Sequence, residues 1–165
     1  MAEDAKHEEL RRIPPPDDAD WWVERTAPGV WPGRTKRGAT VLMATSRAGL
    51  PDAFSPGELL KLALAGCAAM SSEEAIARRL GADYPATIAV DGTEHETEDR
   101  YAAFDETFLL DLAGLDDAAR ETLATVIRRT IQHDCTVGLT LQNDVTITQH
   151  IDDASIPEAG SPTEP

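Results

Sequence analysis

The spacing of apolar residues predicts two strands at the start of the folded part of the chain. Residues 21–26 and 39–46 form short runs typical of strands, and a Pro- and Gly-rich loop at 27–38 separates them. This loop carries the one concentration of basic residues in the sequence, namely Arg34, Lys36 and Arg37. It is therefore the first place to look for a positively charged partner to a site.

A long helix is predicted over residues 55–80, where apolar residues recur at helical spacing. The segment Ser55-Pro56-Gly57-Glu58 opens it with an N-cap serine, a proline at the first helical position and the glutamate of a capping box. Gly81 is expected to end the helix. A second capping box at Ser71 leaves a break near that residue open.

The second half of the chain predicts a hairpin, a second helix and a last strand. Strands at 86–91 and 101–112 flank an acidic turn, and alternate residues of the second strand share one side: Phe104, Glu106, Phe108, Leu110 and Leu112. A helix is expected from Asp116 or Asp117 to about residue 132, and a period-two run over 137–148 predicts a strand or a hairpin. The order β-β-α-β-β-α-β indicates an α+β fold with helices packed on antiparallel sheets.

Composition and charge narrow the class of partner. Aromatic residues make up only 5% of the chain, so few rings are available to stack on bases, and the net charge of -15 would repel nucleic acids and anionic membrane surfaces. The apolar run at 59–70 is too short to span a bilayer, and no signal peptide is readable. We therefore expect a cytoplasmic protein with no nucleic-acid partner and no membrane insertion.

Both ends of the chain are acidic and poor in apolar residues. Residues 1–20 contain seven acidic and three basic residues around three consecutive prolines, and residues 152–165 contain four acidic residues and no basic one. Such segments cannot bury enough apolar surface to become ordered. We expect two disordered acidic arms, 1–20 and 152–165, around one folded domain at 21–151.

Two cysteines carry the main chemical question. Two are too few for a disulfide scaffold, so they are either buried small residues or redox groups. Cys67 lies within the apolar helix, whereas Cys135 stands at a junction between the second helix and the last strand. A reactive thiol needs a lowered pKa, and the cations that could lower the pKa of Cys67 are Arg34 and Arg37 of the basic loop.

A metal site is a weaker interpretation of the same residues. Cys67, Cys135 and His133 could supply three zinc ligands, but no paired ligand spacing supports such a site. His133 suits the carboxyl end of the second helix, where the helix dipole favours a cation. We expect no metal ion and no organic cofactor.

Three segments, taken in order, resemble one family. They are Phe54-Ser55-Pro56-Gly57-Glu58-Leu59-Leu60 leading into Ala65-Gly66-Cys67, the later Cys135-Thr136-Val137, and the upstream Gly33-Arg34. Together they resemble the family of osmotically inducible protein C and organic hydroperoxide resistance proteins (OsmC/Ohr). The resemblance extends over about residues 21–150 and implies an intertwined homodimer with two sites at its interface.

The resemblance implies a thiol-dependent peroxidase that reduces organic hydroperoxides in defence against oxidative stress. Cys67 would be the peroxidatic cysteine, Cys135 the resolving cysteine, and Arg34 the residue that stabilises the thiolate. An external thiol reductant or a lipoylated protein would reduce the resulting disulfide. The alternative is a catalytically weak OsmC-like protein that binds a small molecule or serves as a stress-associated scaffold.

The chain departs from the family pattern at two positions. Gly57 stands ten residues before Cys67, where the family commonly has the glutamate that orients the arginine. Glu58 is next to it, but its place in the capping box already accounts for it. Thr136 follows Cys135 where family members often have proline.

Overall fold

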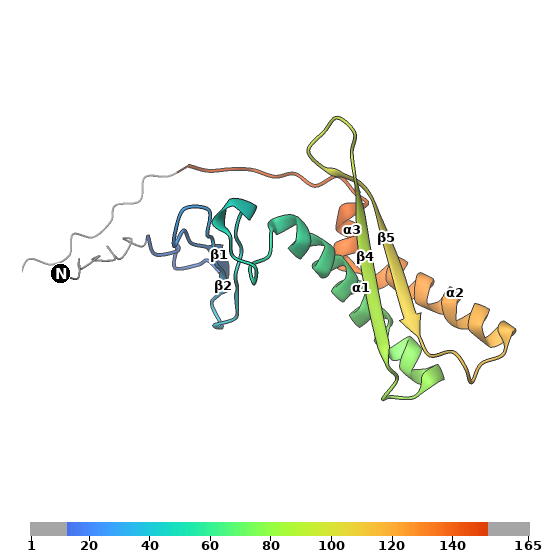
Figure 1. The fold of residues 1–165 in the computed structure, drawn as a ribbon. Coiled ribbons are helices and arrows are strands. Elements are labelled where there is room, and N and C mark those ends of the chain that lie inside the picture. Colours follow the sequence, from blue (N-terminus) through green and yellow to red (C-terminus); the bar gives the residue numbers. More distant parts are fainter. Residues whose placement is uncertain (1–12, 152–165) are drawn as a thin grey trace, which may run out of the picture. The chain divides into compact units, whose positions relative to one another are not determined.

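The computed structural model describes residues 13–151 of the chain (Figure 1). Within this range the chain forms two compact units, residues 13–56 with 148–151 and residues 57–147, where one domain at 21–151 was predicted. The predicted C-terminal arm and the first twelve residues of the N-terminal arm lie outside the described residues. In the described part of the N-terminal arm, the Asp20 carbonyl accepts a hydrogen bond from the Lys36 N–H at 2.9 Å.

The first unit holds a small antiparallel sheet with the strand order β1-β2-β3. Its strands are β1 (Trp21–Val23), β2 (Gly33–Thr35) and β3 (Thr40–Val41). The predicted loop at 27–38 is wrong in part, because β2 lies inside it with Arg34 opposite Trp22. The turn occupies only Ala27–Val30, where Gly29 has a φ of 74° and the Val30 N–H donates to the Ala27 carbonyl. The chain is extended again three residues later, so it pairs with β1.

The strand predicted at 39–46 is interrupted after two residues. Beyond β3, Met43 forms an isolated bridge with Phe54, and Ala44 forms one with Val30. Because these two neighbours pair with different segments, no continuous ladder can form there. A 3-10 helix, η1 (Ser46–Ala48), follows and ends at Gly49, which has a φ of 64°.

The second unit begins with α1, which runs without a break over Pro56–Leu80. The break considered near Ser71 is absent, and the buried Ser72 hydroxyl donates to the Ala68 carbonyl at 2.8 Å within the helix. The predicted end is confirmed, since the Gly81 N–H donates to the Ala77 carbonyl and Gly81 has a φ of 94°.

A long antiparallel hairpin follows, formed by β4 (Ala86–Glu94) and β5 (Tyr101–Leu110) (Figure 1). The hairpin was predicted, although β4 extends three residues beyond the expected end. Burial along β5 alternates as predicted, with one side half-buried and the other exposed. The half-buried side carries three apolar residues and one acid: Phe104, Glu106, Phe108 and Leu110.

The end of the second unit differs most from the prediction. Helix α2 (Asp117–Asp134) begins as expected, since the Asp116 carboxylate accepts from the Ala119 N–H at 2.8 Å. A short helix, α3 (Thr136–Leu141), then replaces the first half of the strand predicted at 137–148, and residues 143–151 have no regular secondary structure.

Local capping and the lack of a partner strand explain this difference. Cys135 caps α3 through its sulfur atom, which accepts from the Gly138 N–H, and the Thr140 hydroxyl donates to the Thr136 carbonyl. The later part of the run, with Val145 and Ile147 exposed, lies beside no strand within residues 13–151. Alternation alone does not make a strand without a neighbour to pair with.

Side chains from α1, α2 and β5 form the core of the second unit. Ile76, Leu123 and Ile127 are buried together, and half-buried side chains surround them: Leu80, Tyr84, Phe108, Leu110, Leu112, Leu115 and Ile131. The helices therefore pack on the inner side of the hairpin, and the α+β class predicted from the element order is confirmed.

Candidate functional site

The structure brings the two cysteines together, although they lie far apart in the sequence. Cys67 is half-buried near the middle of α1, and its thiol hydrogen-bonds with the thiol of Cys135. Cys135 is fully buried, with 0% exposure, at the junction of α2 and α3. Both are free thiols, and backbone N–H groups of adjacent residues contact the two sulfurs.

The first turn of α3 supplies one backbone donor to each sulfur. The Val137 N–H donates to Cys67 Sγ at 3.5 Å, and the Gly138 N–H donates to Cys135 Sγ at 3.3 Å. A Cβ atom at position 138 would lie 3.2 Å from Cys135 Sγ, so glycine lets the backbone approach the sulfur closely. Because the sequence predicts a strand here, it gives no reason to expect these backbone N–H donors at the sulfurs.

The surroundings of Cys67 favour its thiolate. Burial raises the pKa of the Cys67 thiol, but hydrogen bonds from the Val137 backbone, the Cys135 thiol, Ser71 and the Thr136 backbone together lower that pKa below its ordinary value of 9.0. These donors are neutral groups, whereas the sequence favours a cation for this role.

The surroundings of Cys135 act in the opposite direction. Burial raises the pKa of the Cys135 thiol, and so do the hydrogen bond with Cys67 and the negative charge of Glu106, while the Gly138 N–H only partly offsets them. Of the two sulfurs, the half-buried Cys67 therefore carries the thiolate more readily. Cys135 stays protonated, which makes the pair chemically asymmetric.

Arg34 is a strand residue of the first unit, paired with a carboxylate. Its Nε atom donates to Glu24 Oε1 at 2.6 Å, and both side chains are mostly buried. Arg37 is exposed in the turn that follows β2. Cys67 belongs to the second unit, so an interaction of Arg34 with the thiolate remains a prediction.

Sequence reasoning missed Glu24 as the partner of Arg34. The signal was the hairpin register, because Arg34 faces Trp22 and Glu24 is two residues further along the same side of the chain. A loop at 27–38 leaves this register undefined. The structure thus supplies the arginine with a carboxylate from the residue that follows β1.

The zinc interpretation finds no support in the described residues. In residues 13–151, no group of three His, Cys, Asp or Glu side chains is arranged to hold a metal ion. His133 is exposed in the last turn of α2, as predicted, and its Nδ1 atom contacts the Asp134 carboxylate at 2.6 Å. None of the helices in this range is both long and apolar enough to cross a membrane.

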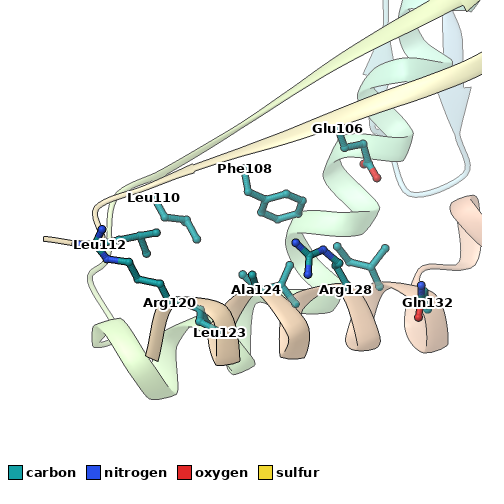
Figure 2. Close-up of a pocket in the computed structure, with 11 residues that line it drawn as sticks. Glu106, Phe108, Leu110, Leu112, Arg120, Leu123, Ala124, Arg128 and Gln132 are labelled. Carbon is teal, nitrogen blue, oxygen red and sulfur yellow. The ribbon is translucent and has the colours of Figure 1, made fainter. Parts of the chain in front are cut away.

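Glu106 is a second residue whose role the sequence did not reveal. Its side chain projects from β5 toward α2, into a cavity of about 410 Å³ that it shares with Phe108, Leu123 and Arg128 (Figure 2). Its Oε1 atom is buried without a hydrogen-bond partner among the described residues. The signal in the sequence was an acid at an inward position of an otherwise apolar alternation.

Comparison with known proteins decides the family, because the family model described as OsmC-like protein matches residues 49–150. The chain belongs to the OsmC-like family. An uncharacterized protein of Mycobacterium tuberculosis is 43% identical over 132 residues, covering 80% of this chain and 95% of that protein. An uncharacterized protein of Mycobacterium bovis matches to the same extent.

Solved structures agree with this OsmC-like assignment at the level of the fold. A hypothetical protein from Aquifex aeolicus has a TM-score of 0.57 at 13% identity, covering 74% of this chain and 85% of the other. A protein from Psychrobacter arcticus has a TM-score of 0.56 at 17% identity, covering 74% and 87%. The family predicted from the three segments is confirmed.

In this OsmC-like chain, a tyrosine side chain lies beside Gly57, the first of the two departures from the family pattern. Gly57 lies in the first turn of α1, and the side chain of Tyr101 from β5 fills the space beside it. Two neighbours hold the Tyr101 ring, Phe104 with its ring centroid at 5.0 Å and Lys61 with its Nζ atom at 5.3 Å. A tyrosine therefore occupies the place that a larger residue at position 57 would need.

Proposed function

We propose that this OsmC-like protein is a cysteine-based peroxidase that reduces organic hydroperoxides, with Cys67 as the peroxidatic and Cys135 as the resolving cysteine. The observation that carries the proposal is the pair of free thiols in hydrogen-bond contact, with the pKa of Cys67 lowered and that of Cys135 raised. A reaction in two steps requires this asymmetry. The thiolate of one cysteine attacks the hydroperoxide first, and the other cysteine remains a thiol until the sulfenic acid has formed.

The chemistry follows from the two protonation states. The Cys67 thiolate attacks the outer oxygen of the hydroperoxide, the O–O bond breaks, and the alkoxide takes a proton to leave as an alcohol. Cys67 becomes a sulfenic acid, which Cys135 attacks to form a disulfide and release water. An external dithiol or a lipoylated protein then reduces the disulfide by thiol exchange.

An apolar substrate suits the cavities near the cysteine pair. The cavity of about 410 Å³ is lined mainly by aliphatic and aromatic side chains, and it shares Glu106, Ile131 and Gln132 with a second cavity of about 400 Å³. Gly138, whose N–H binds Cys135, lines the second cavity. Volumes of this size hold small apolar molecules, so an organic hydroperoxide fits better than hydrogen peroxide.

Arg34 completes the proposed site as a stabiliser of the Cys67 thiolate. The Glu24 carboxylate holds the guanidinium and so supplies the orienting acid that position 57 lacks. The support is chemical, since a guanidinium stays charged at all relevant pH values and favours a thiolate.

A homodimer is part of the same proposal. Apolar side chains on α1 remain exposed in the single chain, namely Leu60 (36%), Leu62 (49%) and Met70 (75%). A second copy packed on this helix would remove them from water, in line with the intertwined dimer that the family resemblance implies.

The decisive experiment measures consumption of cumene hydroperoxide with a dithiol reductant in excess. We expect turnover by the wild type, none by Cys67→Ser, and a single oxidation followed by arrest in Cys135→Ser. Mass spectrometry of the oxidised wild type should show a peptide in which Cys67 and Cys135 are crosslinked. A protein that binds an apolar hydroperoxide without consuming it would instead be the small-molecule binder, the reading that Gly57 favours.

A further inference from the structure

Glu106 occupies a position that neither packing nor an ion pair explains. It lies on the inner, half-buried side of β5 between Phe104 and Phe108, where an apolar residue would be expected. Its buried Oε1 atom has no hydrogen-bond partner among the described residues. An orphaned carboxylate oxygen costs folding free energy, so its presence calls for a reason other than stability.

Glu106 and the backbone around the resolving cysteine line one cavity. Glu106 and Gly138 both line the cavity of about 400 Å³, together with Leu64 and Ile131. The Gly138 N–H donates to Cys135 Sγ, and the Cys135 N–H donates to the Ile131 carbonyl. Two lining residues of this cavity are thus the backbone partners of Cys135.

The charge of the Glu106 carboxylate affects the pKa of the Cys135 thiol. The negative charge of Glu106 contributes to raising the pKa of the Cys135 thiol, although burial is the larger cause. Burial in turn raises the pKa of the Glu106 carboxyl above its ordinary value of 4.5. A carboxylate with a raised pKa is a stronger base than an ordinary glutamate.

We propose that Glu106 is the general base that takes the proton of Cys135 when this cysteine closes the disulfide with Cys67. The proposal rests on the peroxidase function above, because that function supplies the oxidised Cys67. As Cys135 Sγ attacks the sulfenic sulfur, its proton passes to the Glu106 carboxylate, the S–S bond forms and the S–O bond breaks. Cys135 is oxidised and the sulfenic sulfur is reduced, while the departing hydroxide takes a proton from solvent to become water. Glu106 then returns its proton to solvent.

Arginine side chains from α2 and from the end of the hairpin turn line the two cavities together with Glu106. Helix α2 presents Arg120 and Arg128 to the larger cavity, and the residue before β5, Arg100, lines the smaller one while paired with Glu98. Helix α1 contributes Leu64 to the smaller cavity. The groups whose pKa is shifted here, Glu106 and the two thiols, are the ones that the reaction uses.

The test isolates the attack of Cys135 from the hydroperoxide step. Dithio-bis-nitrobenzoate first places nitrothiobenzoate on Cys67, and the attack of Cys135 then releases it in a phase whose rate does not depend on reagent concentration. We expect Glu106→Gln to slow this second phase about tenfold or more near neutral pH, as loss of a general base should. The wild-type rate should rise with pH through the titration of Glu106, and the variant should lack that rise.

Asp105→Asn is the matched control for Glu106→Gln, and two results would contradict the proposal. Asp105→Asn removes a neighbouring carboxylate from the exposed face of β5 and should leave the second phase within about twofold of wild type. An unchanged second phase in Glu106→Gln would overturn the proposal. A faster one would also overturn it, because it would mean that the charge of Glu106 only holds the proton on Cys135.

The same design separates this proposal from the peroxidase function. Consumption of cumene hydroperoxide reports on the oxidation of Cys67 and does not involve the nitrothiobenzoate phase. Suppose that the wild type does not consume hydroperoxides but that Glu106→Gln still slows the second phase. That result would refute the peroxidase function and support Glu106 as the base for Cys135. Should Glu106→Gln fail to fold, the wild-type pH profile decides, and a profile without the Glu106 rise counts against the proposal.

Discussion

The hydroxyl oxygen of Tyr101 lies 2.7 Å from the point where a Cβ atom would stand at Gly57. No real Cβ atom tolerates so short a contact, so any larger residue at position 57 must displace the tyrosine. The ring cannot move freely, because a Cβ atom at Gly92 would lie 2.8 Å from its other side. The absence of the family's glutamate and the presence of Tyr101 are therefore two parts of one arrangement.

This contact predicts coupled effects on stability. We expect Gly57→Ala to cost about 1 kcal/mol in the wild type, as overpacking does. In a Tyr101→Phe background the clash disappears, and the same change should be neutral or stabilising by up to about 1 kcal/mol, because alanine favours the helix. Urea unfolding of the four proteins measures the coupling, and equal effects in both backgrounds would contradict the contact.

The hydrogen bond between the two thiols predicts how Cys67 titrates. Removing the Cys135 donor with Cys135→Ala should raise the pKa of Cys67 and slow its alkylation by iodoacetamide several-fold near neutral pH. Cys135→Ser retains a donor and should keep the alkylation rate closer to wild type. The rate is followed by peptide mapping over a range of pH. An identical profile for the alanine and serine variants would show that Cys135 does not tune Cys67.

Glu106 predicts a stability that depends on pH with a definite sign. Because the pKa of its carboxyl is raised in the folded state, its favourable contribution is present below the unfolded value of 4.5 and is lost as pH rises through the folded pKa. Glu106→Gln should therefore be more stable than wild type at about pH 8, by about 1 kcal/mol, because the amide removes a negative charge from this partly buried position.

The difference between Glu106→Gln and wild type should shrink as the pH falls. Urea unfolding between about pH 8 and 5.5 checks this and avoids the isoelectric point near 4.5, where net charge vanishes. Asp105→Asn, on the exposed side of the same strand, is the control and should show no comparable trend. A constant difference for Glu106→Gln would mean that its carboxyl is not shifted.

The Arg34–Glu24 pair predicts a larger cost than an exposed pair of the same length. Glu24→Gln should destabilise the protein by about 1 kcal/mol or more, because both side chains are mostly buried. Glu74→Gln breaks the Arg78–Glu74 pair, also 2.6 Å long but 62% and 86% exposed, and should cost only about 0.3–0.5 kcal/mol. Double-mutant cycles measure both. If Arg34 also serves the thiolate, Glu24→Gln should slow the oxidation of Cys67 and Glu74→Gln should not.

The exposed apolar residues of α1 predict self-association. Light scattering at micromolar concentration should give about twice the chain mass of 17.8 kDa. Leu62→Glu places a charge on the exposed surface of α1 and should shift the protein toward the monomer, whereas Glu74→Gln, further along the same helix, should not. A monomer mass for the wild type would refute the dimer.

The sequence was informative where local signals and the fold agree. The capping of α2 by Asp116, the end of α1 at Gly81 and the alternation along β5 all depend on neighbours in sequence. The cysteines could be singled out because the chain has only two and shows no other catalytic motif, and the resemblance gave each of them a role.

The predictions that failed involved contacts that hydrophobic spacing does not reveal. Residues 137–141 alternate as a strand would, but the Cys135 sulfur and the packing of Gly138 favour a helix there. The same error concealed the Val137 N–H, which is a main reason for the lowered pKa of Cys67. Glu24 gains its meaning from the register of the β1–β2 hairpin, and Glu106 from the cavity that its side chain lines.

Cys135 ends α2 with its backbone N–H and begins α3 with its sulfur. Oxidation of that sulfur weakens its capacity to accept the Gly138 N–H, so the corner between the two helices senses the oxidation state of the protein directly. Reduced and oxidised forms should then differ in how fast the amides of α3 exchange with solvent, although no residue of α3 changes chemically.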